Sequence, residues 1–366
     1  MGTFTNLGLK KEIIKVLSKL RFNESLDVQD KVIPLAMKRK NIVFTSMTGS
    51  GKTLAYSLGF LGKINPKQGI QMLIVVPTRD LCIQVGKELS NIGEPLGFNV
   101  ATLYGGRDLI GDYRTTTKKN QIMVGTPGRL IQHINEKTIK VGEVKLIVYD
   151  ESDQMFDNGF QEMCSYIRQR VSKDSQIILS SATISEKVKE FMNQEIVHYE
   201  LLEIGIQIPQ KIIQEKILCK IEDKNELLLA FFAKREFKRV IIFCNTKVRS
   251  YDIAEFLEKN KLKAKYINSD LEQFQRQNVL NLFKAGKFNI LVATDVAARG
   301  LHIDKVDMII NYDAPPRAEF YVHRIGRTGR ANHPGYALSI ICPEDEERFA
   351  RLEEEFKIDV KMIEEV

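Results

Sequence analysis

VFTSMTGSGKT, residues 43–53, reads as an apolar strand followed by a glycine-rich turn, Lys52 and Thr53. Glycines allow backbone N–H groups to close around phosphate oxygens, the lysine can reach the terminal phosphates, and the threonine hydroxyl can ligate Mg²⁺. The general pattern has glycine where Ser46 stands, so a glycine-rich turn that opens an ordinary helix is the alternative. We predict a phosphate-binding loop formed by Thr48, Gly49, Ser50, Gly51, Lys52 and Thr53.

Eight further runs rich in Ile, Val and Leu alternate with stretches of helical periodicity. They are residues 72–78, 121–127, 145–151 and 176–183 in the first half, and 240–246, 289–295, 307–313 and 337–343 in the second. Continuous apolar strands that alternate with helices are typical of parallel sheets covered on both faces. Ligands of such open α/β sheets bind at the carboxyl ends of the strands. The sequence therefore predicts an α/β fold whose functional residues share a sheet edge.

The length of the chain favours two domains. Its 366 residues exceed what one hydrophobic core usually holds, since domains average about 150 residues. Between the two series of strands, Gly205 and Pro209 interrupt regular structure. We predict a first lobe over residues 1–204, a linker over 205–211 and a second lobe over 212–366.

The composition is that of a globular protein, with 43% hydrophobic and 28% charged residues. No apolar run approaches the roughly 20 residues that a membrane span needs, and the first residues lack the shape of a signal peptide. The five cysteines are scattered without a C-x-x-C pair. We expect an intracellular protein with reduced thiols and no membrane association, located in the cytoplasm, with the nucleus as the alternative. The net charge of +7 fits an anionic partner such as nucleic acid without requiring one.

VYDESDQMF, residues 148–156, places Asp150, Glu151 and Asp153 at the end of a predicted strand. A solvated turn is the plain alternative, because polar residues are common wherever a strand ends. In the same lobe as a phosphate-binding loop, however, Asp150 can hold Mg²⁺ while Glu151 orients or deprotonates the attacking water. The two segments together predict hydrolysis of a nucleoside triphosphate.

With Ser152 between these acids, the segment DESD resembles the namesake motif of the DEAD-box RNA helicases of superfamily 2. The resemblance covers nearly all of the chain, and its motifs stand in the order of that family. It implies two tandem RecA-like lobes, ATP and Mg²⁺ as cofactors, and an ATP-dependent RNA helicase. RNA-stimulated ATP hydrolysis would then be coupled to lobe closure, RNA bending and local unwinding of short duplexes, or to remodelling of RNA–protein complexes.

The resemblance also assigns residues that contact the nucleoside. Phe4 and residues 21–29 resemble the adenine-reading motif, in which Gln29 would bond the adenine edge. The family usually has Gly and Pro where Arg21 and Ser25 stand. His302 stands where the family commonly has aspartate, and a neutral imidazole can still accept a bond from a ribose hydroxyl. We expect modestly altered nucleotide affinity as a result.

Further motifs resemble the RNA-backbone motifs of the family: PTRDL (77–81), YGG (104–106), TPGR (126–129), IIFCNT (241–246) and TDVAARGLHID (294–304). The implied RNA-binding residues are Pro77, Thr78, Arg79, Gly105, Gly106, Thr126, Pro127, Gly128, Arg129, Asn245, Gln273, Arg276 and Thr294. Such contacts to phosphates position a single strand or short duplex without reading its sequence. They also imply an affinity that falls steeply as salt rises.

Two more motifs would couple the lobes. In SSAT (180–183), Ser181 and Thr183 could hydrogen-bond Asp153 and link two strand ends. In HRIGRTGR (323–330), the resemblance assigns a coupling role to His323 and makes Arg327 and Arg330 arginine fingers. A solvated strand end and a basic patch are the respective alternatives.

Two other functions share these motifs. One is a clamp that ATP latches onto RNA with little turnover, and release of RNA on hydrolysis would distinguish it from a helicase. The other is a DNA helicase or translocase, which the set of RNA motifs and Gln29 argue against. We expect a monomer, with accessory proteins as further partners.

Overall fold

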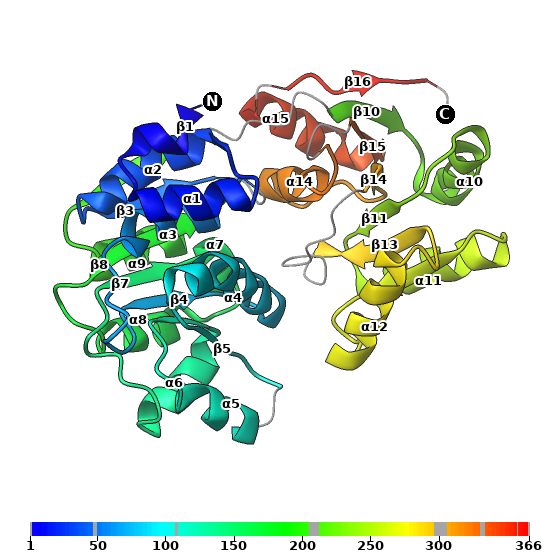
Figure 1. Ribbon diagram of the computed structural model, residues 1–366. Helices are drawn as coiled ribbons and strands as arrows, with labels where there is room; N and C mark the ends of the chain where they lie inside the picture. The colour runs from blue at the N-terminus through cyan, green and yellow to red at the C-terminus, as the bar shows by residue number, and fades with distance from the viewer. Residues whose placement is uncertain are drawn as a thin grey trace. The chain divides into compact units, whose positions relative to one another are not determined.

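A computed structural model describes residues 2–46, 50–106, 109–204, 212–295, 306–329, 334–356 and 358–364. The chain divides into two compact units, Met1–Gly205 and Ile206–Val366, and each is described by itself (Figure 1). The predicted linker, residues 205–211, lies outside the described residues, so its course stays a prediction. In the described part of the chain, no helix is both long and apolar enough to cross a membrane.

The first unit is built on seven parallel strands in the order β5-β6-β4-β7-β8-β3-β9. Their bounds are β3 (Asn41–Thr45), β4 (Met72–Val75), β5 (Val100–Leu103), β6 (Ile122–Gly125), β7 (Leu146–Tyr149), β8 (Gln176–Ser181) and β9 (Tyr199–Glu203). The helices are α1 (Lys11–Lys19), α2 (Asp27–Met37), α3 (Lys52–Leu61), α4 (Arg79–Gly93), α5 (Leu109–Thr116), α6 (Pro127–Asn135), α7 (Ser152–Asp157), α8 (Gln161–Arg168) and α9 (Glu186–Glu195). A small antiparallel pair, β1 (Gly2–Thr3) and β2 (Glu24–Ser25), precedes this sheet.

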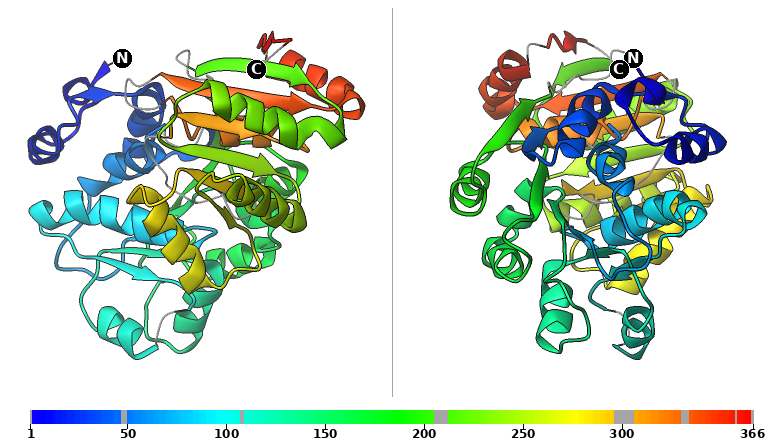
Figure 2. Two further views of the ribbon diagram at one scale, coloured as in Figure 1. Left: turned by 90° about the vertical axis from the view of Figure 1, so that its right-hand side faces the viewer. Right: turned by 60° about the vertical axis from the view of Figure 1, so that its left-hand side comes forward.

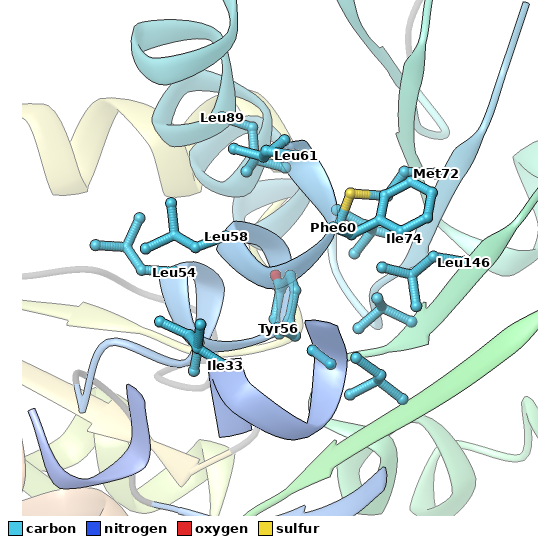
Figure 3. Close-up of a cluster of buried hydrophobic side chains, with 14 of the residues drawn as sticks. Ile33, Leu54, Tyr56, Leu58, Phe60, Leu61, Met72, Ile74, Leu89 and Leu146 are labelled. Atoms are coloured by element: carbon cyan, nitrogen blue, oxygen red, sulfur yellow. The ribbon is translucent and has the colours of Figure 1, made fainter. Parts of the chain in front are cut away.

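Both faces of this sheet are covered. Side chains alternate across a strand, so Met72 and Ile74 of β4 enter one core cluster while Leu73 and Val75 enter the other. Helices α1 to α4 supply the first cluster and α6 to α9 the second. Figure 3 shows the first cluster, where α3 side chains around Tyr56 and Phe60 pack toward residues of β4 and β7. The predicted parallel sheet with helices on both faces is confirmed.

The second unit repeats this plan in the order β12-β13-β11-β14-β15-β10-β16 (Figure 2). Its strands are β10 (Ile212–Leu218), β11 (Val240–Cys244), β12 (Ala264–Ile267), β13 (Ile290–Thr294), β14 (Met308–Asn311), β15 (Gly335–Ile341) and β16 (Lys361–Met362). The described helices are α10 (Lys224–Lys234), α11 (Lys247–Lys259), α12 (Gln273–Lys284), α14 (Ala318–Ile325) and α15 (Glu346–Phe356). Two clusters again lie on opposite faces, with α10 and α11 in one and α12 in the other.

The two sheets have the same connectivity. When the strands of each sheet are numbered in chain order, both sheets read 3-4-2-5-6-1-7. In the first sheet, this order makes β7, β8 and β3 consecutive neighbours and groups β5, β6 and β4 beside them. The carboxyl ends of parallel strands lie at one edge of a sheet, so the connectivity decides which motifs become neighbours there.

Candidate active site

Three adjacent strands of the first lobe carry the residues predicted to bind and hydrolyse the nucleotide. The phosphate-binding loop follows β3, the acids follow β7 and the SSAT segment ends β8. Strand β8 pairs with both β7 and β3. Ser46 also donates its backbone N–H to the carbonyl of Ser181 at 2.9 Å. The structure therefore brings three segments that are distant in sequence to one edge of the sheet.

The phosphate-binding loop is described from Ser50 onward, whereas Thr48 and Gly49 lie outside the described residues. Gly51 has a φ of 84°, in the left-handed region that favours glycine, and helix α3 begins at Lys52. The Lys52 ammonium is buried and donates to the carbonyl of Ser46 at 3.0 Å. Ser46, which replaces the usual glycine, has its hydroxyl 2.6 Å from that of Ser50. The serine thus adds a bond within the loop.

Gln29 is held directly against this loop. Its amide nitrogen donates to the carbonyl of Gly51 at 3.2 Å, and its amide oxygen accepts the backbone N–H of Leu26 at 2.9 Å. A Cβ at Gly51 would lie 2.4 Å from that nitrogen, so only glycine fits. An amide has two N–H donors and two lone pairs on its oxygen. One donor and one lone pair therefore stay available for the predicted adenine contact.

The structure gives less direct information about the other residues predicted to contact the nucleoside. Arg21 has a φ of 65°, which explains why glycine is usual there in the resembled family. Ser25 is buried and its hydroxyl donates to Asp30. Phe4 is 3% exposed and packs in the first core cluster, so its contact with adenine stays a prediction. His302 lies outside the described residues.

The two acids after β7 have different surroundings. Asp150 is 3% exposed, and its backbone N–H continues the sheet by donating to Val75 at 3.0 Å. One carboxylate oxygen, Oδ1, accepts the N–H of Glu151 at 3.0 Å, and Oδ2 accepts the hydroxyl of Tyr56 at 3.1 Å. Glu151 has a φ of 51° and a ψ of 50°. This left-handed conformation costs a residue other than glycine about 1–3 kcal/mol and is concentrated at functional sites.

Tyr56 and Glu88 are site residues that the sequence analysis missed. Burial raises the pKa of the Tyr56 phenol well above its usual value, and the charge of Asp150 raises it further, so the phenol stays protonated as a donor. Burial also raises the pKa of the Glu88 carboxyl on α4, with a further contribution from Asp150, while the Thr53 side chain partly offsets both. A tyrosine in an apolar helix, four residues after Lys52, is the signal that could have drawn attention to this position, since a buried hydroxyl needs a partner.

In the SSAT segment, the predicted bond between Ser181 and Asp153 is present, whereas Thr183 is bonded to Ser181. The backbone N–H of Asp153 donates to the Ser181 hydroxyl at 3.3 Å, and that hydroxyl donates to the carbonyl of Thr183 at 2.7 Å. The Asp153 carboxylate instead accepts the backbone N–H of Gln154 at 3.0 Å. The two strand ends are joined, but by the amide of Asp153 and the carbonyl of Thr183. The Asp153 carboxylate and the Thr183 hydroxyl take no part in these bonds.

Ser152 replaces the alanine of the resembled motif, and its buried hydroxyl donates to the carbonyl of Ser180 at 3.2 Å. Substitution Ser152→Ala should lower the free energy of unfolding by about 0.5–1.5 kcal/mol, the usual net value of one hydrogen bond. ATP turnover should stay within about twofold of the parent, because the hydroxyl faces the sheet. Urea unfolding and steady-state hydrolysis check the two expectations. A collapse of turnover would contradict our assignment of the acids.

The RNA-backbone motifs of the first lobe follow three further strands of this sheet, β4, β5 and β6. Thr78 caps α4 by accepting the N–H of Leu81 at 3.2 Å, and Thr126 precedes α6, whose first residue is Pro127. The Arg79 guanidinium lies 5.0 Å from the centre of the Tyr104 ring, beside Gly106. Two helix N-termini and an arginine at one edge form a surface suited to phosphates. The structure thus brings this set of motifs together.

Arg129 occupies a more buried place than a phosphate contact requires. Its Nε donates to the fully buried Asp112 carboxylate at 2.7 Å, and its Nη1 donates to Gln132 at 2.8 Å. The side chain is 10% exposed. Because Arg129 neutralises a buried acid, it stabilises the lobe, and its contact with RNA stays a prediction.

In the second lobe, Asn245 directly follows β11, and Thr294 ends the neighbouring strand β13. The Asn245 amide donates to the carbonyl of Ala314 at 3.1 Å and accepts from Arg324 at 2.9 Å. Arg324, which the sequence analysis did not single out, is 1% exposed and makes two bonds to Asp295, at 2.7 and 2.6 Å. Asn245 is itself exposed but is bonded to the buried Arg324, and its direct contact with RNA stays a prediction.

The predicted arginine fingers and the motif on α12 are described in part. Arg327 is 4% exposed, and its Nε donates to the carbonyl of His323 at 3.3 Å. Arg330 lies outside the described residues. Gln273 and Arg276 occupy the first turns of α12, and the side chain of Gln273 is not among those described.

Two family models match the chain. Residues 26–191 match the model described as DEAD/DEAH box helicase, and residues 219–332 match the helicase conserved C-terminal domain. The chain is 37% identical over 348 residues to the ATP-dependent RNA helicase CshA of Listeria monocytogenes, covering 94% of this chain and 67% of that protein. It is 38% identical over 351 residues to the DEAD-box ATP-dependent RNA helicase CshA of Geobacillus kaustophilus, covering 94% and 74%.

Solved structures with the same fold include one of a complex with ligands. S. cerevisiae Dbp5 bound to RNA and ADP BeF3 matches with a TM-score of 0.88 and 26% identity, covering 100% of this chain and 96% of that one. A DEAD box protein from Methanococcus jannaschii matches with a TM-score of 0.58 and 33% identity, covering 100% and 99%. These likenesses extend over both predicted lobes.

Proposed function

Because the chain belongs to the DEAD-box family of ATP-dependent RNA helicases, we propose that its RNA-stimulated ATP hydrolysis separates short RNA duplexes or remodels RNA–protein complexes. The observation that carries this proposal is the placement of Lys52 and Thr53, after β3, and of Asp150, after β7, at one edge of the sheet with only β8 between the two strands. Phosphoryl transfer depends mainly on positioning and on stabilising charge. A lysine, a hydroxyl and a carboxylate at one sheet edge supply both.

The chemistry follows from the side chains. Lys52 binds the terminal phosphates, and Gln29 contacts the adenine through its remaining donor and lone pair. Thr53 and Asp150 are hard oxygen ligands of the kind that Mg²⁺ takes together with substrate phosphates, so they fit this ion. Bound Mg²⁺ would neutralise charge that develops on the phosphate oxygens. Glu151 orients or deprotonates the attacking water.

The second lobe completes the site in this proposal. Arg327 and Arg330 neutralise charge on the transferring phosphoryl group, so hydrolysis requires the lobes to close. Closure also joins the RNA surface of the first lobe, around Arg79, to that of the second lobe, around Arg276. Because RNA and ATP favour the same closed state, each should tighten binding of the other by the same factor. Hydrolysis then resets the open state and releases RNA.

The protein is proposed to work as a monomer with accessory proteins. S. cerevisiae Dbp5, which has the same fold, has been solved bound to Gle1. A partner that binds one lobe of the present chain could likewise shift the equilibrium between open and closed states.

The proposal is tested by steady-state ATP hydrolysis with single-stranded RNA, with single-stranded DNA of matched sequence and with neither. We expect RNA to stimulate turnover at least tenfold more than DNA does. In parallel, the affinity of a fluorescent non-hydrolysable ATP analogue is measured with and without RNA, and RNA affinity with and without the analogue. The two coupling factors should be equal and greater than one.

Three results would point elsewhere. Equal stimulation by DNA would favour a DNA helicase or translocase. Tight ATP-dependent retention of RNA with almost no turnover would favour the clamp. Equal analogue affinity with and without RNA would rule out the proposed coupling through closure.

A further inference from the structure

We propose that Tyr56 is a positioning residue for the reaction, whose hydroxyl fixes the Asp150 carboxylate in the orientation that receives the Mg²⁺ of a bound nucleotide. This inference rests on the proposed function, because it takes Asp150 as the acid that holds the metal. We expect neither the hydroxyl nor the aromatic ring of Tyr56 to contact ATP. Tyr56 would act only through Asp150.

The geometry holds the carboxylate from two sides. Tyr56 lies on α3 and is fully buried, with its ring inside the apolar cluster of Figure 3. Its hydroxyl donates to Oδ2 of Asp150 at 3.1 Å, while Oδ1 accepts the N–H of Glu151 at 3.0 Å. Among the described residues, each oxygen therefore has one protein donor, and the two donors come from different elements of the fold.

The chemistry of the position favours a role for the hydroxyl. Phenylalanine would fill the same space in this cluster, and burying a hydroxyl is unfavourable unless it gains a partner. Here the partner is an acid that is 3% exposed, and hydrogen bonds to charged groups are stronger than neutral ones. The first five residues of α3 also include Lys52, Thr53 and Tyr56. One helix therefore carries the phosphate-binding lysine, the proposed metal-binding hydroxyl and the donor that orients the metal-binding acid.

Loss of this donor should loosen the carboxylate without removing it. The terminal torsion of an aspartate is broad, so a carboxylate with one donor can rotate away from the orientation that the metal needs. Partners that orient a metal ligand typically change metal affinity or activity by about 10–100-fold. Since phosphates share the binding of Mg²⁺ here, we expect the lower end, about tenfold, for Tyr56→Phe.

The readout is binding rather than activity. The affinity of fluorescently labelled ADP is measured in EDTA and then at rising concentrations of free Mg²⁺, for the parent chain and for Tyr56→Phe. We expect equal affinities in EDTA and a Mg²⁺ midpoint about tenfold higher in the variant. Steady-state ATP hydrolysis should show the same rise in its Mg²⁺ midpoint, with recovery of turnover at saturating Mg²⁺.

Tyr149→Phe is the matched control. Tyr149 directly precedes Asp150, is also fully buried, and its hydroxyl donates to the carbonyl of Cys164 at 3.1 Å. It packs in the second core cluster, on the opposite face of the sheet. This variant also loses one buried hydrogen bond, but to a neutral carbonyl, so it should lose somewhat less stability than Tyr56→Phe and keep the parent Mg²⁺ midpoint.

Four results would overturn the inference. An unchanged Mg²⁺ midpoint in Tyr56→Phe, or an equal shift in Tyr149→Phe, would make Tyr56 an ordinary core tyrosine. Tyr56 would also be an ordinary core tyrosine if adding Tyr56→Phe to an Asp150→Asn variant still raised the Mg²⁺ midpoint, because Tyr56 would then not act through Asp150. This comparison with the double variant can be used even if Tyr56→Phe alone is poorly stable. If the parent chain itself showed no Mg²⁺-dependent tightening of ADP, the assignment of Asp150 in the proposed function would fail as well.

Discussion

Replacing Glu151 with glutamine should lower RNA-stimulated ATP turnover by about 10²–10⁴-fold, the usual contribution of a general base. Glutamine keeps the size and hydrogen-bonding capacity of glutamate but cannot accept a proton from the attacking water. The backbone of Glu151 is already in the left-handed conformation, with a φ of 51°, and glutamine can adopt it as readily as glutamate. Binding of ATP and RNA should therefore be retained.

Turnover and binding have to be measured together. Steady-state hydrolysis with saturating RNA gives the loss of turnover, and the affinity of a non-hydrolysable ATP analogue shows whether the site is intact. Glu143→Gln, at an exposed position of the same lobe, is the control and should behave like the parent chain. Turnover of Glu151→Gln within a few fold of the parent would mean that another group activates the water.

Replacing Arg324 with methionine should destabilise the second lobe by about 3–5 kcal/mol, the usual cost of removing one partner of a buried ion pair. The guanidinium is 1% exposed and bonds Asp295, the carbonyl of Asp313 at 2.8 Å and Asn245. Methionine would fill part of the space but leave Asp295 without this partner. Loss of the guanidinium also removes the bond to the Asn245 amide oxygen, which leaves its bond to Ala314, so RNA-stimulated turnover should fall together with stability.

Urea unfolding followed by circular dichroism measures this effect, since the chain has no tryptophan to report on folding. The matched control is Arg348→Met, which removes a 2.6 Å ion pair with Asp345 from a side chain that is 44% exposed. Exposed pairs contribute only about 0–1 kcal/mol, so this variant should unfold close to the parent. Comparable losses in the two variants would show that burial of the Arg324 network is not what stabilises the lobe.

Strands with a continuous apolar run were predicted from the sequence, and the others were not. The eight runs correspond to β4, β6, β7, β8, β11, β13, β14 and β15, and each lies inside its sheet between two neighbours. The sequence analysis did not identify β5, β9, β12 or β16, which lie at the sheet edges. An edge strand is partly exposed, so its residues need not be continuously apolar. Strand β10 was also missed, because exposed and buried residues alternate along it.

Local sequence also determined which residues would stand at the strand ends. Because a parallel sheet gathers its carboxyl ends at one edge, the loop around Lys52 and the acid Asp150 were expected to meet, and they follow strands separated only by β8. The predicted bonds of Ser181 and Thr183 to Asp153 named the right segments. Ser181 does bond Asp153, through the backbone N–H of Asp153, whereas the carbonyl of Thr183 accepts from Ser181, since such details depend on how each turn closes.

The sequence by itself thus determined the α/β class, the repetition of strands and helices in two halves, and the motifs at the ends of the strands. Only the tertiary structure decided the partners of the buried polar groups. Tyr56 hydrogen-bonds Asp150 at a sequence separation of 94 residues. The corresponding separations are 29 residues for Arg324 and Asp295 and 17 for Arg129 and Asp112. A buried polar group must be paired to avoid a large desolvation cost, and the available partner depends on which helices and strands the crossover connections make neighbours.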